Sequence, residues 1–284
     1  MSDIQQKKPL TPGHVIVVLI LCVVSLLFIA PILLVFLNSF KGKLFVINTP
    51  FAFPNAESFT GLTNYVNGIA ATGFFSAFGW SLFITVFSVA IIVLFTSMTA
   101  WYITRRTDSH FCKALYFAFV FAMIVPFQMV MFPLTKVANL LHLDNPLGIL
   151  VLYLGFGSAQ SVFLFSGFVK SVPIAVEEAA TIDGCTPIRA YFAVIFPMLA
   201  PIAVTVAILN AMWVWNDFLL PNLVIGSEYR TIPVAVQYLR GGYGSIDWGY
   251  MMAMIGLAVI PIIVFYFACQ KHIIAGVTAG SVKG

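Results

Sequence analysis

Hydrophobic residues form six long runs along the chain, and short polar segments separate them. The runs cover residues 14–37, 77–102, 111–135, 147–169, 191–219 and 248–270. A helix needs about 20 residues to cross the hydrocarbon core of a bilayer, and each run meets that requirement. The pattern therefore predicts an all-α membrane protein with six transmembrane helices in residues 14–275, a short tail at 1–13 and another at 276–284. Six crossings place both termini on one side.

Composition supports the membrane class and excludes others. The chain of 284 residues is 61% hydrophobic and only 8% charged, whereas soluble domains carry about 25% charged residues. Its net charge of +4 is small, and no run of Lys and Arg could neutralise a row of phosphates, so we expect no nucleic-acid partner. The first hydrophobic run is too long for a signal peptide and lacks a cleavage site, so we expect it to be retained.

The distribution of Lys and Arg predicts the orientation of the chain. One side of the predicted topology collects nine of the 14 basic residues, and the other collects five. The richer side holds Lys7, Lys8, Arg105, Arg106, Lys113, Lys170, Arg189, Lys271 and Lys283. We therefore expect both termini and the polar loop 171–190 to be cytoplasmic. Cys112 and Cys185 then lie in cytoplasmic loops, and no disulfide or metal site is predicted.

The predicted spans lack groups that would drive transport or catalysis. Only Asp217 and Asp247 among the ten acids lie close to a span, and both sit at span ends. A carrier driven by protons or sodium usually needs an ionisable group near the membrane midplane. The chain also has no GxxxxGK[ST] loop, no HExxH and no GxSxG. Any uphill transport would therefore take its energy from a cytoplasmic partner.

The loop 171–190 contains the signals of a short helix. Pro173 suits its first turn, Glu177 and Glu178 follow near the positive end of the helix dipole, and Gly184 can end it. Thr186-Pro187 can then cap the next helix, which Pro197 and Pro201 would bend early. The product is an amphipathic helix on the membrane surface, joined to the fifth span. From the pattern alone, an ordinary surface loop is an equal alternative.

A longer pattern resembles a known family. Glu178-Ala179-Ala180, three residues, Gly184, nine residues, and then Val194, Phe196 and Pro197 resemble the EAA loop (EAA-x3-G-x9-I-x-L-P) of ABC importer permeases. Val and Phe replace Ile and Leu of that pattern. "GLTNYVN" (61–67), "WNDFLLP" (215–221), "YRTIPVAVQYLRGGYGSIDWGYMMA" and the tail "QKHIIAGVTAGSVKG" are similar to segments of carbohydrate importers, and the last two to the second permease subunit of the maltose type.

This resemblance implies a type I permease fold and a transporter in which separate subunits form the pathway, hydrolyse ATP and bind the sugar. The chain would be a bacterial inner-membrane subunit that forms half of a sugar pathway, without enzyme activity, cofactor or metal of its own. Its partners would be a second, different permease, two copies of a cytoplasmic ABC ATPase and a sugar-binding protein outside. ATPase coupling would involve Glu177, Glu178, Ala179, Ala180, Asp183, Gly184 and Pro197, and the tail residues Gly280, Ser281, Lys283 and Gly284 would contact the ATPases.

Polar and aromatic residues within the spans are candidates for the sugar pathway. Asn210, Trp213 and Asp217 share one helical face, with Asn216 beside them. The other candidates are Tyr153, Gln160 and Gln128. Such residues more often join helices to one another, so a packing role is the favoured alternative. Trp80, Trp101 and Trp248 lie near span ends, as interfacial anchors do.

Two other functions remain open from the sequence. One is an ABC permease for a non-sugar solute such as a phosphorylated polyol, for which the partner subunit could supply the basic residue that these spans lack. The other is a secondary carrier that works alone. Transport that survives loss of every ATPase would indicate the second.

Overall fold

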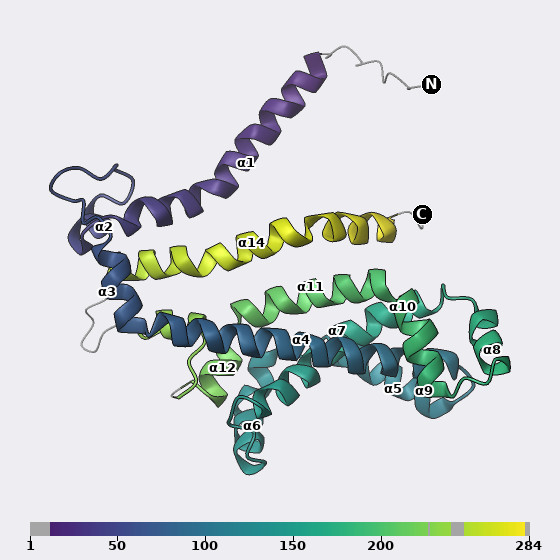
Figure 1. Cartoon of the computed structure of the whole chain (residues 1–284). Helices are drawn as coiled ribbons and strands as arrows, with labels where there is room; N and C mark the ends of the chain where they lie inside the picture. Colours follow the sequence, from purple (N-terminus) through teal and green to yellow (C-terminus); the bar gives the residue numbers. More distant parts are fainter. Residues whose placement is uncertain (1–11, 227, 240–246, 282–284) are drawn as a thin grey trace. The chain divides into compact units, whose positions relative to one another are not determined.

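The computed structural model describes residues 12–226, 228–239 and 247–281, and helices dominate this part of the chain (Figure 1). No strand occurs among these residues, and β pairing is limited to an isolated bridge between Lys41 and Phe59. The chain divides into two compact units. The first comprises Met1–Ala71 and Leu239–Leu257, and the second comprises Thr72–Tyr238 and Ala258–Gly284.

The first unit contains α1 (Pro12–Ser39), α2 (Lys43–Asn48), most of α3 (Thr63–Thr72) and the start of α14 (Trp248–Ser281). A buried lysine fixes the end of α1 to the loop that follows. The Lys41 ammonium is 1% exposed and donates to the Thr49 carbonyl at 2.9 Å and to Asn38 Oδ1 at 3.2 Å. Burial lowers the pKa of this ammonium. Asn64 of α3 donates to the carbonyls of Ser39 and Lys41, each at 2.8 Å.

The second unit is built around three long helices that pack side by side. These are α4 (Phe74–Arg105), α7 (Gly148–Val169) and α11 (Ala200–Asn216). The shorter elements are α5 (His110–Ala122), α6 (Phe127–Leu140), α8 (Ile174–Ile182), α9 (Pro187–Ala190), the π-helix η1 (Tyr191–Ile195), α10 (Phe196–Met198), α12 (Leu219–Val224) and α13 (Ile232–Gln237). Small residues such as Gly157 and Ser161 on the buried face of α7 allow α4 and α11 to approach it closely.

Four helices of the described chain are long and apolar enough to cross a membrane. They are residues Gly13–Ser39, Phe74–Arg105, Gly148–Val169 and Trp248–Lys271. Two bent pairs of helices also qualify when each pair is taken as one span, which gives up to six crossings. The pairs are His110–Ala122 with Phe127–Leu140, and Pro187–Met198 with Ala200–Asn216. The structure is thus an all-α membrane protein, as the sequence predicts.

The predicted span 111–135 is not one continuous helix in the structure. The structure has α5 and α6 instead, and the two are bent by 109° at a break of a few residues. Pro126 lies at this break as the N-cap of α6. Proline has no N–H to donate and disfavours a helical conformation in the residue before it, so the helix cannot continue through this position.

The predicted span 191–219 is also broken, as its two prolines suggested. The segment before the break and α11 are bent by 78°, with Leu199 between them. Helix α11 ends at Asn216, and Asp217 has an extended conformation. At the other end of the chain, α14 continues to Ser281, so much of the predicted tail 276–284 is helical. Gly276 and Gly280 cost about 1 kcal/mol each in a helix, which is too little to stop it.

Candidate functional site

Helix α8 is the core of the predicted coupling loop, and it begins one residue after Pro173, which the sequence placed in its first turn. Pro173 is the N-cap, and Glu177 lies in the first turn. After Asp183, Gly184 has φ +78°, a left-handed conformation that favours glycine. The Gly184 N–H donates to the Thr181 carbonyl and the Cys185 N–H to the Ala180 carbonyl, both at 3.0 Å. This is a Schellman motif, which closes the helix and turns the chain sharply.

The next helix starts immediately after this turn. Thr186 is the N-cap of α9, its hydroxyl accepts from the Arg189 N–H at 3.4 Å, and Pro187 occupies the first turn. A helix stop and a helix start therefore follow each other within three residues. The turn fixes the angle between α8 and the helix α9 that follows it.

The two faces of α8 differ in exposure. Ala180 is buried against the protein, whereas Glu178, Ala179 and Asp183 are exposed. Ile182 is 86% exposed, which is unusual for a large apolar side chain at a polar segment. Among the described residues, Glu178 has no hydrogen-bond or ion-pair partner. An acid, a small residue and an apolar side chain together form an outward surface suited to another protein.

Glu177 lies on a different face of α8 from Glu178 and contacts α4. Arg105 Nε donates to Glu177 Oε1 at 2.7 Å, and Arg105 Nη2 donates to the Val172 carbonyl at 2.8 Å. Both charged side chains are 17% exposed. From the sequence, Glu177 was grouped with Glu178 among the predicted ATPase-coupling residues, and in the structure its carboxylate binds Arg105 of the same chain. Adjacent helical residues differ by about 100° in direction, so the two acids cannot share one face.

A π-helical turn connects α9 to the rest of this bent segment. Tyr191 of η1 is fully buried, and its hydroxyl lies 2.5 Å from Ser97 Oγ of α4. Its ring packs against Trp101, with the ring centroids 5.4 Å apart. Trp101 was expected to anchor the membrane interface, yet its indole nitrogen is buried in this cluster. Pro197 is exposed and precedes the break at Leu199.

The structure brings three of the predicted pathway residues together. Tyr153 is fully buried in α7, and its hydroxyl donates to Asp217 Oδ2 at 3.0 Å. Its ring packs edge-to-face on Trp213, with centroids 5.4 Å apart. Asp217 Oδ1 also accepts from the N–H of Leu219, the first residue of α12, at 3.0 Å. The Asp217 carboxylate is therefore already bound on both oxygens.

The other candidates do not form a cluster with this group. Asn210 is buried and donates to Ser161 Oγ of α7 at 3.1 Å, so it joins α11 to α7. Asn216 is exposed and donates to the Met212 carbonyl of its own helix at 2.7 Å. Gln128 and Gln160 are exposed on α6 and α7. A packing role, the alternative weighed from the sequence, describes the contacts of Tyr153 and Asn210.

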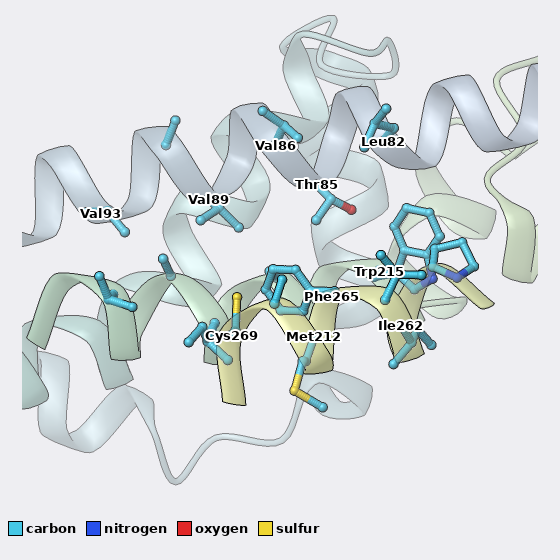
Figure 2. Close-up of a pocket in the computed structure, with 18 of the residues that line it drawn as sticks. Leu82, Thr85, Val86, Val89, Val93, Met212, Trp215, Ile262, Phe265 and Cys269 are labelled. Atoms are coloured by element: carbon cyan, nitrogen blue, oxygen red, sulfur yellow. The ribbon is translucent and has the colours of Figure 1, made fainter. Parts of the chain in front are cut away.

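A large apolar cavity in the second unit was not foreseen from the sequence. It measures about 1120 Å³ and lies between α4, α11 and residues 260–269 of α14. Figure 2 shows Leu82, Val86, Val89 and Phe265 among the side chains around it, with the Thr85 hydroxyl as one of its few polar groups. Such a surface offers almost no hydrogen bonds to sugar hydroxyls. No spacing of polar residues could have revealed it, because its lining resembles every other apolar run.

No group of three or more metal-ligating side chains occurs among the residues that the structure describes. The four cysteines are free, and Cys112 is buried whereas Cys185 is partly exposed.

Comparisons with known proteins bear on this arrangement. Residues 92–279 match a family model described as a binding-protein-dependent transport system inner membrane component. The probable starch degradation products transport system permease protein AmyC of Thermoanaerobacterium thermosulfurigenes is 40% identical over 262 residues, which cover 92% of this chain and 94% of that protein. The multiple sugar-binding transport system permease protein MsmG of Streptococcus mutans is 37% identical over 268 residues, which cover 93% of this chain and 95% of that protein.

A solved structure has the same fold. It is a bacterial ABC transporter involved in the import of the acidic polysaccharide alginate, and one of its chains superimposes with a TM-score of 0.75. The match covers 94% of this chain and 98% of that chain, at 20% sequence identity. At this identity the likeness concerns the fold alone.

Proposed function

Because the chain belongs to the family of binding-protein-dependent transport system inner membrane components, we propose that it is a permease subunit of an ATP-driven oligosaccharide importer. It forms half of the translocation pathway beside a second, different permease. Two copies of a cytoplasmic ABC ATPase supply the energy, and an extracellular or periplasmic binding protein delivers the sugar. The chain itself has no nucleotide-binding loop, so hydrolysis belongs to the partner.

The outward surface of α8 is the observation that carries this proposal. Glu178, Ala179 and Ile182 are exposed, and Gly184 turns the chain immediately after them. These residues belong to the EAA pattern through which permeases of this kind couple to their ATPases. An unpaired carboxylate beside an apolar side chain suits a cleft that offers a basic group and an apolar wall. Glu178 therefore pairs with a basic residue of the ATPase, and Ile182 enters the cleft.

The sugar class follows from the relatives. The names of three similar permeases refer to starch degradation products, multiple sugars and arabinooligosaccharides. A neutral oligosaccharide agrees with the described spans, because the carboxylate of Asp217 at the end of α11 is already bound by Tyr153 and the Leu219 N–H. Trp213, Asn216, Gln128 and Gln160 remain accessible for contact with sugar. Tyr153 and Asn210 support the helices behind them.

Membrane orientation completes the proposal. Both termini, α8 and the C-terminal residues Gly280, Ser281, Lys283 and Gly284 face the cytoplasm, where the tail contacts the ATPases. Lys283 and Gly284 lie outside the described residues, while Gly280 and Ser281 belong to the last turn of α14.

Reconstitution tests the function directly. The chain is placed in proteoliposomes with the second permease, ATPase and binding protein that purify with it. Uptake is measured for starch-derived and arabinose-derived oligosaccharides and for a phosphorylated polyol. We expect uptake of an oligosaccharide only when ATP and all four components are present. Uptake that persists without the ATPase would indicate a secondary carrier, and preference for the phosphorylated polyol would refute the sugar class.

A further inference from the structure

We propose that Arg105 is a positioning residue that fastens α8 to the end of α4, so that α4 carries the movement of the coupling segment across the membrane. The coupling segment is defined here as residues 172–191. The inference rests on the proposed function, because it concerns how a displacement of α8 by an ATPase reaches the pathway. It assigns to Arg105 and Glu177 a role apart from contact with the ATPase.

The geometry of Arg105 is that of a clamp with two attachment points. Its Nε binds the Glu177 carboxylate in the first turn of α8, and its Nη2 binds the Val172 carbonyl just before that helix. A guanidinium is planar, so two bonds to two separate groups fix its direction as well as its distance. Val172 is itself buried in the same cluster as Ile103 of α4 and Val169 of α7. The entry into α8 is thus fixed on the end of α4.

The neighbouring arginine has a different environment. Arg106 is exposed, and its guanidinium lies 4.6 Å from the centre of the Tyr102 ring of its own helix. It bonds to no residue of the coupling segment in the part of the chain that the structure describes. Among the described residues, these two adjacent arginines have the same side-chain chemistry, but Arg105 is connected to α8 and Arg106 is not.

A second contact fastens the other end of the coupling segment to α4. The Tyr191 hydroxyl meets Ser97 Oγ, and both side chains are fully buried. Ser97 precedes Arg105 by eight residues, which is about 12 Å along a helix. Contacts on both sides of α8 and α9 thus reach the same helix. A displacement of α8 cannot leave α4 in place without breaking one of them.

The backbone that leads from α9 into α11 transmits a displacement of α8 less well than α4 does. After α9 the backbone forms a π-helical turn and then bends by 78°. Such a segment can absorb movement in its own hydrogen bonds. Helix α4, in contrast, runs over 32 residues without a proline, a length of about 48 Å. A continuous helix transmits a displacement at one end to the other.

The test uses the complete transporter in proteoliposomes. Arg105→Gln, Glu177→Ala and the double variant are compared with Arg106→Gln as the matched control. The readouts are sugar transported per ATP hydrolysed, attachment of the ATPase and thermal stability. We expect Arg105→Gln and Glu177→Ala each to lower the sugar-to-ATP ratio roughly fivefold, with the ATPase still attached. The double variant should be no worse than Arg105→Gln, because both changes break one clamp. Arg106→Gln should transport normally.

Arg105→Lys keeps the charge but cannot hold two fixed directions, so its ratio should fall between those of Arg105→Gln and the unmodified chain. An unchanged ratio in both Glu177→Ala and Arg105→Lys would overturn the proposal, even if Arg105→Gln failed to assemble. If thermal stability falls in proportion to the sugar-to-ATP ratio, the Arg105 contacts only stabilise the fold. That result would also overturn the proposal. A change of Glu178 tests the proposed function separately: if Glu178→Lys also transports normally, the coupling function itself fails.

Discussion

Asn210 of α11 donates a hydrogen bond through Nδ2 to Ser161 Oγ of α7 at 3.1 Å, one helical turn from Gly157. The same amide donates to the Val206 carbonyl at 2.8 Å, so both of its hydrogens are used. A Cβ at Gly157 would lie 2.6 Å from Ile92 Cδ1 and 2.9 Å from Asn210 Oδ1. Three long helices therefore meet at a point where only glycine fits.

Replacing Gly157 by alanine should destabilise this contact. The added methyl must displace Ile92 of α4 or the Asn210 amide, and overpacking of this kind costs about 1–3 kcal/mol. Gly155→Ala is the matched control, because a Cβ there meets nothing within 4 Å. That change should be neutral or stabilise the helix by up to about 1 kcal/mol. Thermal unfolding in detergent measures both, and equal effects would contradict close packing at Gly157.

Reversing the charge of Glu178 should uncouple the transporter. The side chain is exposed and has no partner among the residues that the structure describes, so Glu178→Lys should leave folding and membrane insertion unchanged. A like charge against a basic cleft of the ATPase should weaken binding and abolish sugar-stimulated hydrolysis. Asp108→Lys, at another exposed acid on the same predicted side, should have little effect. Full stimulation in Glu178→Lys would show that α8 is only a connector.

A branched side chain at Gly184 should impair coupling through the backbone. Nothing lies within 4 Å of a Cβ built there, so any effect comes from the φ of +78°. A left-handed conformation costs roughly 1–2 kcal/mol for an L-residue and more for a β-branched one. Gly184→Val should therefore lower uptake strongly, whereas Gly184→Asn should lower it less, because asparagine tolerates this conformation. Equal uptake in both variants would argue against the turn.

Thiol labelling should report the orientation of the coupling segment. Cys185 is partly exposed, whereas Cys112 is 3% exposed and should react poorly from either side. In intact cells, a membrane-impermeant maleimide should not label Cys185 until the membrane is permeabilised. Glu57→Cys, an exposed position in a predicted outer loop, should be labelled without permeabilisation. Labelling of Cys185 in intact cells would reverse the topology.

Removal of Thr278 to Gly284 should weaken ATPase attachment or ATP-driven uptake several-fold while leaving insertion intact. The deletion removes the last turn of α14, which ends at Ser281, together with Val282, Lys283 and Gly284. Uptake and co-purification of the ATPase are measured together in truncated and full-length proteins. If both are unchanged, this end of the chain has no role in coupling.

Hydrophobicity and backbone chemistry, read from the sequence alone, determined the membrane helices, the short helix of the loop 171–190 and the bend that follows it. Long apolar runs predict membrane helices because lipid cannot satisfy an unpaired backbone group, and the helices α4 and α7 follow from that rule. The short helix of the 171–190 loop and its stop at Gly184 follow from local signals, since caps and left-handed turns depend on a few neighbouring residues. The bend beside Pro197 and Pro201 follows in the same way.

Only the tertiary structure decided which side chains meet. Glu177 and Glu178 are chemically identical neighbours, and their different contacts depend on Arg105, which is 72 residues away from Glu177 in the chain. Tyr153 and Asp217 are separated by 64 residues and Ser97 and Tyr191 by 94. Helical periodicity defines a face but not the helix that covers it. That choice belongs to the packing of the whole unit, because each buried polar atom must find its partner among all helices that surround it.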